Sequence, residues 1–255
     1  MPPAWIKPTI ALRPAREQDR EQDREQDREQ DRKQDRKIVG FWHIGAVGDW
    51  SRIVGEQYSK LRDSGLYDAS EKIIVGFVGG QSHERELTVP LLDDPKFDLF
   101  TTASVEDYEF PTVARVWREA REAEHRKESI LCYYFHTKGA SLIATPQERA
   151  ANAWRVYMEY FNIERWEDCA AILDAYDTCG VELQSKESHY SGNFWWATSD
   201  YIRRLPDGYQ YWAQNKHNRL AAEFYLCQAH PRAYCFKDFV ENLYDYEVSP
   251  GEYRG

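Results

Sequence analysis

The 255-residue sequence has no apolar stretch long enough to cross a bilayer, and its first residues lack the apolar core of a signal peptide. Its five cysteines are an odd number, with no C-x-x-C pair and no zinc-like spacing. A formal net charge of -10 argues against the broad basic surface that nucleic acids require. These absences predict a cytoplasmic protein without a disulfide framework, a transmembrane segment or a nucleic-acid partner.

Aromatic residues are abundant, which predicts a substantial core. The chain is 42% hydrophobic and 15% aromatic, with 9 Trp and 17 Tyr, unlike a disordered protein. Without its unusual first 37 residues, the chain has the length of one full globular domain. We therefore expect one compact domain over residues 38–245, followed by a tail at residues 246–255.

The segment before this domain is a charged repeat. Residues 17–36 repeat the tetrad EQDR four times and then KQDR once, with no apolar residue. Glu17 and Arg20 are three residues apart, a spacing that supports a solvated helix. The repeat cannot build a core, so we predict that residues 1–37 form a disordered or transiently helical arm without a catalytic part.

Apolar runs alternate with helical periodicity through the first half of the domain. Strands are expected at residues 38–44, 73–78, 97–102 and 130–135. Helices are expected at residues 50–66 and 111–125. Strands that alternate with helices predict an α/β, Rossmann-like fold with a mainly parallel sheet.

The second half of the domain is more mixed. Helices are expected around residues 154–161, 166–176, 200–205 and 218–228, and strands at residues 181–183 and 189–196. We divide the domain at about residue 142, into a nucleotide-binding half (38–141) and an acceptor half (142–245).

Ligands of open parallel sheets bind beyond the carboxyl ends of the strands. The first such loop contains Gly45 and Asp49, where a simple tight turn explains the glycine equally well. Gly79-Gly80-Gln81-Ser82-His83 after the second strand is a signal of similar strength. The fourth strand leads into His136-Thr137-Lys138-Gly139, whose composition suits a diphosphate, although a His and a Lys at a strand exit are often only solvated.

Four motifs together resemble one family. His189-Tyr-Ser-Gly-Asn-Phe-Trp-Trp-Ala197, the downstream Tyr-Ile-Arg-Arg-Leu-Pro206, the earlier Tyr-Phe-His-Thr-Lys-Gly139 and Ala-Ala-Glu-Phe224 resemble bacterial and viral glycosyltransferase-like proteins of the GT-A type. The resemblance covers roughly residues 38–230. It implies a GT-A-like domain that binds a nucleotide-sugar donor over the first four strands and a carbohydrate acceptor beside residues 189–196.

The resemblance and the loop positions together suggest two sets of binding residues. Donor or phosphate binding is expected from Gly45, Asp49, His136, Thr137, Lys138 and Gly139. Acceptor binding is expected from His189, Ser191, Gly192, Asn193, Trp195 and Trp196, because aromatic faces stack on sugars and polar groups bond their hydroxyls. The alternative is an ordinary core strand, and we expect at least one of the two tryptophans to be core.

Many GT-A enzymes carry an Asp-x-Asp metal motif after the strand that here ends in His136-Thr137-Lys138, and no such motif stands there. We therefore favour phosphate neutralisation by Lys138 and His136, with no assigned metal ligand and with Mg²⁺ or Mn²⁺ left open as a cofactor. For the catalytic base, Glu223 is the first choice, against a salt bridge with Arg219. Asp200 is the second, against a helix N-cap.

The resulting functional hypothesis is a hexosyl or deoxyhexosyl transferase that moves a sugar from a nucleotide-sugar donor to a carbohydrate acceptor in polysaccharide or glycan assembly. Two alternatives belong to other classes. One is a non-catalytic carbohydrate- or nucleotide-binding protein of the same fold. The other is a Rossmann-like hydrolase or phosphotransferase that uses His136.

Overall fold

The computed structural model describes residues 36–79, 93–102, 104–186 and 188–255. Residues 37–255 form one compact unit, and the fold described below is that of this unit. None of the helices in the described ranges is long and apolar enough to cross a membrane.

A seven-stranded sheet forms the centre of this unit, with strand order β3-β2-β1-β4-β8-β5-β9. The strands are β1 (Lys37–Gly45), β2 (Ser70–Val78), β3 (Phe97–Thr102), β4 (Ile130–His136), β5 (Thr178–Gly180), β8 (Trp195–Thr198) and β9 (Ala233–Cys235). Strands β3, β2, β1 and β4 are parallel, β8 is antiparallel to both its neighbours, and β5 is parallel to β9. The predicted α/β class with a mainly parallel sheet is confirmed.

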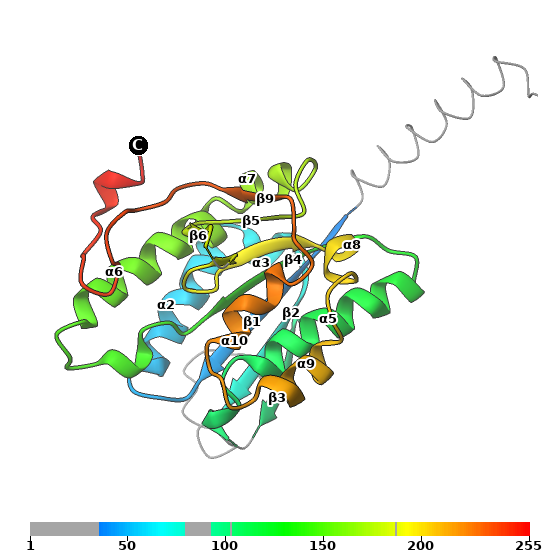
Figure 1. Cartoon of the computed structure of the whole chain (residues 1–255), viewed down its shortest axis with the longest axis horizontal. Coiled ribbons are helices and arrows are strands. Elements are labelled where there is room, and N and C mark those ends of the chain that lie inside the picture. The colour runs from blue at the N-terminus through cyan, green and yellow to red at the C-terminus, as the bar shows by residue number, and fades with distance from the viewer. Residues whose placement is uncertain (1–35, 80–92, 103, 187) are drawn as a thin grey trace, which may run out of the picture. The chain divides into compact units, whose positions relative to one another are not determined.

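Helices cover both faces of the sheet, as Figure 1 shows. One face carries α2 (Trp50–Asp63), α3 (Leu66–Ala69), α6 (Glu148–Glu159) and α7 (Trp166–Ile172). The other carries α5 (Phe110–His125), α8 (Ser199–Ile202) and α9 (Gly208–Asn215). Because both faces are covered, the central strands are almost continuously apolar, which explains why their runs are visible in the sequence.

The second half of the domain departs from its predicted boundaries. The strand expected at residues 189–196 is two strands, β7 (His189–Tyr190) and β8, and β7 pairs with β6 (Leu183–Gln184) in a separate two-stranded sheet. Between them the backbone turns with positive φ at Gly192 and Asn193. The helix expected at residues 218–228 is α10 (Ala221–Phe224) followed by a 3₁₀ turn (Tyr225–Cys227), and α9 was not predicted.

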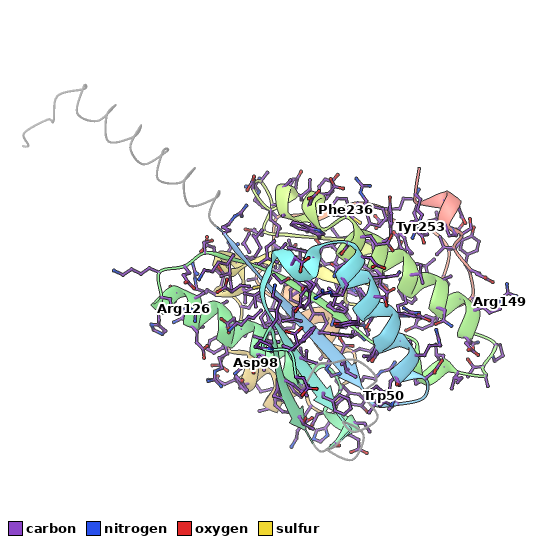
Figure 2. The ribbon with its side chains drawn as sticks, turned by 180° about the vertical axis from the view of Figure 1, so that it is seen from behind. Trp50, Asp98, Arg126, Arg149, Phe236 and Tyr253 are labelled. Carbon is purple, nitrogen blue, oxygen red and sulfur yellow. The ribbon has the colours of Figure 1, made fainter. Side chains whose placement is uncertain are left out.

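Residues 246–255, expected as a tail, contribute to the core. Val248 and Tyr253 are buried, and a short 3₁₀ turn (Pro250–Glu252) lies between them. The rings of Phe236 and Tyr253, both labelled in Figure 2, have their centres 5.4 Å and 6.4 Å from that of Phe161. Phe161 belongs to the π-helical turn that follows α6. The packed unit therefore includes these last residues.

Candidate functional site

A cleft of about 380 Å³ lies at the carboxyl ends of β1 and β4. In the strand order, β2 lies on one side of β1 and β4 on the other, so the strand order reverses between β1 and β4. Such a switch point is where open α/β sheets bind ligands. Residues that line the cleft and enter the argument below are His43, Gly45, Glu109, His136, Thr137, Lys138, Gly139, Arg219, Glu223 and Tyr244.

Lys138 brings a buried positive charge to this cleft. The residue is only 8% exposed, and its Nζ lies 4.0 Å from the centre of the Trp154 ring and 5.1 Å from that of Tyr244. Its hydrogen bond to the Tyr244 hydroxyl is long, at 3.5 Å. Among the described residues, no carboxylate lies within ion-pair distance of Lys138. A buried ammonium whose described contacts are two aromatic rings and one long hydrogen bond favours an anionic ligand, because burial of an uncompensated charge is costly.

The loop that carries Lys138 is hydrogen-bonded to β1. The amide of Gly45 donates to Thr137 Oγ1 at 3.1 Å, and the amide of Thr137 donates to the carbonyl of His43, also at 3.1 Å. Gly139 has a φ of +84°, a left-handed conformation in which side chains are strained. The structure thus gathers Gly45 and the whole His136–Gly139 segment around one cleft.

Asp49 is the exception among the expected donor-binding residues. It is not among the described residues that line the cleft, and its carboxylate pairs with Arg52 one turn along α2. The Gly80-Gln81-Ser82-His83 part of the loop after β2 lies outside the described residues.

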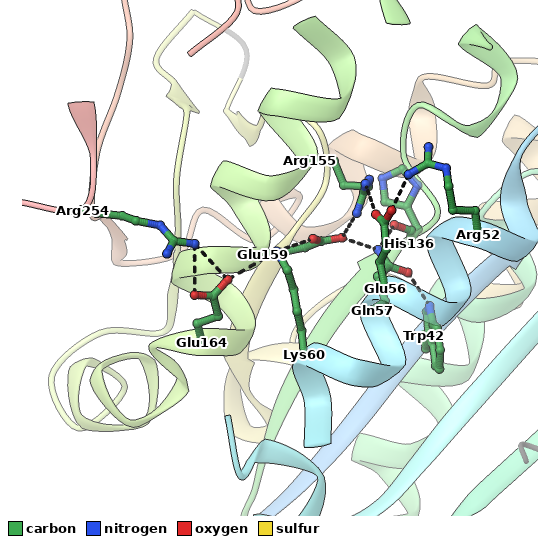
Figure 3. Close-up of polar contacts among 10 residues, drawn as sticks. All are labelled: Trp42, Arg52, Glu56, Gln57, Lys60, His136, Arg155, Glu159, Glu164 and Arg254. Atoms are coloured by element: carbon green, nitrogen blue, oxygen red, sulfur yellow. Dashed lines mark hydrogen bonds and ion pairs between the residues drawn. The ribbon is translucent and has the colours of Figure 1, made fainter. Parts of the chain in front are cut away.

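A buried polar network holds the backbone at His136 in place (Figure 3). The side-chain amide of Gln57 donates to the His136 carbonyl at 2.8 Å and to Glu159 at 2.9 Å, and its oxygen accepts from Trp42 Nε1 at 2.8 Å. Arg155 in turn donates to Glu159 at 2.7 Å. This network joins β1, α2 and α6 behind the cleft.

The fully buried Glu159 carboxylate is the centre of that network. Although burial opposes ionisation, the Arg155 and Lys60 cations lower the pKa of Glu159. Its oxygens lie 2.7 Å from Arg155 Nη1 and 2.8 Å from Lys60 Nζ. Removal of one partner would leave a buried charge uncompensated, so we expect the network to keep the strand exit rigid.

The imidazole of His136 lines the cleft, and its Nε2 is hydrogen-bonded to the turn at Gly192. Its Nε2 lies 2.9 Å from the carbonyl oxygen of Gly192. Burial, reinforced by the nearby charge of Lys138, lowers the pKa of His136 to about 4. Burial also lowers the pKa of the neighbouring His43 to about 4. Both rings are therefore neutral at pH 7.

Two of the carboxylates that line the cleft, Glu223 and Glu109, approach His136 or its partner Gly192. Glu223, on α10, accepts a long hydrogen bond of 3.4 Å from the Gly192 amide. It forms no ion pair with Arg219 among the described residues, so the alternative salt bridge is absent there. Glu109, at the start of α5, accepts hydrogen bonds through Oε2 from the Tyr134 hydroxyl at 2.8 Å and from Asn193 Nδ2 at 2.6 Å.

Sequence analysis did not select Glu109. Its other oxygen, Oε1, lies 3.8 Å from His136 Nδ1, yet the two residues are far apart in the chain. The available signal was its position at the start of the helix that follows the third parallel strand, which places it at the same edge of the sheet as the cleft.

Asp200 does not reach the cleft, and we correct that expectation. It is exposed on α8 and pairs with Arg203. Because β8 runs antiparallel to β4, the helix after β8 begins at the edge of the sheet opposite the cleft. Asp200 is not the N-cap either: Thr198 is, and its hydroxyl accepts from the Tyr201 amide.

Both tryptophans expected to stack on an acceptor are core residues, which corrects that interpretation as well. Trp195 and Trp196 are 2% and 0% exposed and lie on opposite faces of the sheet. Their ring centres lie 5.2 Å from that of Tyr134 and 5.0 Å from that of Tyr133, respectively. The core-strand alternative therefore holds for both residues.

The polar residues of the same motif build the wall behind the cleft. Asn193 is 1% exposed, and it donates to Glu109 and accepts from Trp195 Nε1 at 2.9 Å. The amide of Ser191 donates to the carbonyl of Glu182, and His189 packs edge-on against Phe224. Of the described residues that line the cleft, none comes from residues 189–196. The motif orients His136 and Glu109 and is not itself the ligand surface of this cleft.

Within the described ranges, no group of three or more His, Cys, Asp or Glu side chains is arranged to hold a metal ion. In the part of the chain that the structure describes, the carboxylates of the cleft are those of Glu106, Glu109 and Glu223. One oxygen of Glu109, Oε2, already accepts hydrogen bonds from Tyr134 and Asn193.

Comparison with known proteins yields one family. The model of a family described as a domain of unknown function, DUF8361, matches residues 45–238, which is more than half of the chain and includes the described cleft residues other than His43 and Tyr244. No curated protein matches the sequence. The chain belongs to the DUF8361 family.

Proposed function

We propose that this protein is a GT-A-type glycosyltransferase that moves a sugar from a nucleotide-sugar donor to a carbohydrate acceptor in the cleft at β1 and β4. One observation carries the proposal: the same cleft contains a buried cation, Lys138, that has no carboxylate partner among the described residues, and carboxylates that include Glu109 and Glu223. Glycosyl transfer needs a cation, because a negatively charged diphosphate leaves, and a carboxylate, because the acceptor hydroxyl loses its proton. The alternation of strands and helices around the cleft supports the same conclusion.

The cationic part of the cleft suits the leaving group. As the bond between the anomeric carbon and the diphosphate oxygen breaks, the electron pair stays on the phosphate. Lys138 neutralises that developing charge from a preformed, buried position, and the exposed Arg219 adds a second cation on the α10 side. The left-handed turn at Gly139 brings the backbone close to the same region.

The carboxylate part suits the acceptor. In an inverting transfer, the acceptor hydroxyl attacks the anomeric carbon and loses its proton to a carboxylate within hydrogen-bond reach. Glu223 lines the cleft and accepts a single, long hydrogen bond from the described residues, so most of its accepting capacity there is free for a substrate hydroxyl. We assign the base to Glu223. The reaction yields the glycoside, a nucleoside diphosphate and a proton held by Glu223.

A thermal-shift screen of nucleotide sugars, followed by assay of nucleoside diphosphate release with and without acceptor sugars, tests the function. We expect a donor to raise the melting temperature and its turnover to depend on an acceptor. Dialysis against EDTA then tests whether Mg²⁺ or Mn²⁺ is required. Binding without turnover would instead support a binding protein of this fold, and phosphate release from a non-sugar nucleotide would support a hydrolase.

Lys138→Met separates phosphate recognition from nucleoside recognition. We expect it to weaken nucleoside diphosphate binding by about ten- to a hundredfold while nucleoside binding stays unchanged. Lys127→Met is the matched control, because Lys127 is exposed on the loop after α5 and does not line the cleft. Equal losses for both ligands in Lys138→Met would remove Lys138 from the phosphate site.

A further inference from the structure

His136 and Glu109 present hydrogen-bond acceptors to each other. The carbonyl oxygen of Gly192 can only accept, so the Nε2 of His136, 2.9 Å away, carries the proton of the ring. In the neutral imidazole, Nδ1 is then an unprotonated acceptor. It lies 3.8 Å from Glu109 Oε1, which is also an acceptor.

Nothing in the described part of the chain supplies the missing donor. Glu109 receives its two hydrogen bonds, from Tyr134 and Asn193, on Oε2, and Oε1 receives none from a described residue. Protonation of the ring would convert the pair into an ion pair. Burial and the charge of Lys138 oppose that step and lower the pKa of His136 to about 4, so the ring stays neutral at pH 7.

Both side chains are only partly buried and line the cleft, so a ligand can reach the two acceptors. Their side chains are 14% exposed for His136 and 17% for Glu109. A cationic donor is disfavoured, because Lys138 and Arg219 line the same cleft. A neutral molecule with two adjacent O–H groups satisfies both acceptors without added charge.

We infer that His136 Nδ1 and Glu109 Oε1 form a recognition subsite for two neighbouring hydroxyls of one sugar ring. This inference rests on the proposed function and defines the substrate class more narrowly: the sugar bound here carries a vicinal diol. A sugar that lacks either hydroxyl leaves one acceptor unpaired in a partly desolvated site. The cost of that unpaired acceptor lets the site discriminate strongly against such a sugar. Glu223, on the other side of the Gly192 turn, remains the base.

Glu109→Gln tests the subsite with little change in shape. The carbonyl oxygen of Gln can still accept from Tyr134 and Asn193, while its amide can donate to His136 Nδ1 and so fill the place of a hydroxyl. We expect nucleoside diphosphate affinity to stay within about twofold. The binding of the sugar that carries the diol is expected to weaken by about tenfold or more, as measured by calorimetry for the donor and as KM for the acceptor.

The two substrates are distinguished by which constant changes. If the diol belongs to the donor sugar, the extra affinity of nucleotide sugar over nucleoside diphosphate is lost. If it belongs to the acceptor, donor affinity is unchanged and the acceptor KM rises. Glu106→Gln is the matched control, because it removes the same charge from the same cleft at an exposed residue, and it should leave the sugar-dependent constants unchanged.

Deoxy analogues of the bound sugar supply a measurement that needs no variant. The wild-type protein should bind an analogue that lacks one of the two hydroxyls about tenfold more weakly or worse. The inference is overturned if the wild-type protein accepts every monodeoxy sugar equally, or if a folded Glu109→Gln variant keeps both constants. A wild-type protein that binds no nucleotide sugar at all would instead refute the proposed function itself.

Discussion

His136 donates a hydrogen bond through Nε2 to the carbonyl oxygen of Gly192, 2.9 Å away, although the two residues are 56 positions apart in the chain. This bond joins the loop after β4 to the turn before β8. It fixes which nitrogen of His136 carries the proton, and it connects the strongest sequence motif of the second half to the cleft of the first half. The conformation of Gly192 is therefore the first feature to test.

Gly192→Ala should destabilise the protein and disturb the cleft. Gly192 has a φ of +90°, and a Cβ there would lie 2.6 Å from Met158 Sδ. We expect a loss of about 1–3 kcal/mol in the free energy of unfolding, measured by urea denaturation. Gly55→Ala is the control, since a Cβ at this α2 position meets nothing within 4 Å and Ala favours a helix. Equal effects of the two substitutions would contradict the packing argument.

Glu223→Gln should remove chemistry and leave binding intact. Gln keeps the size of the side chain but cannot take the proton from the acceptor hydroxyl. We expect turnover to fall by a factor on the order of a hundred to ten thousand, with donor affinity and melting temperature close to wild type. Unchanged turnover in a folded variant would show that Glu223 has no catalytic part. Unfolding would show that its side chain is structural.

Glu182→Gln should make stability less sensitive to pH. Burial raises the pKa of Glu182 to about 7, and the nearby charges of Asp238 and Glu241 act in the same direction. Between pH 4.5 and 7 the unfolded chain has lost this proton while the folded protein retains it, so ionisation of Glu182 lowers stability as pH rises. We expect the variant to gain on the order of 1–3 kcal/mol relative to wild type above pH 7.

Thermal melts of both proteins at a series of pH values provide the check on Glu182. The difference between the variant and the wild type should grow from pH 4.5 to pH 7 and then stay constant. His43 and His136 have lowered pKa values, and their contribution to stability is lost as pH falls from 6.5 toward 4, in both proteins alike. A difference that is independent of pH would show that the gain of the variant does not come from ionisation.

Deletion of residues 1–36 should leave the melting temperature of residues 37–255 and their ligand binding unchanged. The repeat at residues 17–36 contains no apolar residue, and residues 37–255 form a compact unit of their own. Calorimetric melts of the full chain and the shortened chain give the comparison. A large fall in the melting temperature of the shortened chain would refute this prediction.

The α/β architecture of the first half and one wall of the cleft could be predicted from the sequence alone. Strand β3 was predicted at its observed bounds, because its Phe-Asp-Leu-Phe-Thr-Thr run is bounded by turn residues. Strand β4 was visible because a strand covered by helices on both faces is apolar throughout. The loop from His136 to Gly139 was found for the same reason, since the carboxyl end of a parallel strand is known once the strand is known.

The rest of the cleft and the role of the Trp195-Trp196 pair depend on how distant parts of the chain pack together. Strand β8 runs antiparallel, which turns Asp200 away from the cleft, and nothing in the local periodicity encodes strand direction. The pair is buried because the sheet is covered on both faces. The same residues could also occur in a strand with one face open to solvent, where one of the two tryptophans would be exposed. Glu109 meets His136, and Lys138 meets Tyr244, through contacts between distant segments, and such contacts follow from packing and not from any local sequence pattern.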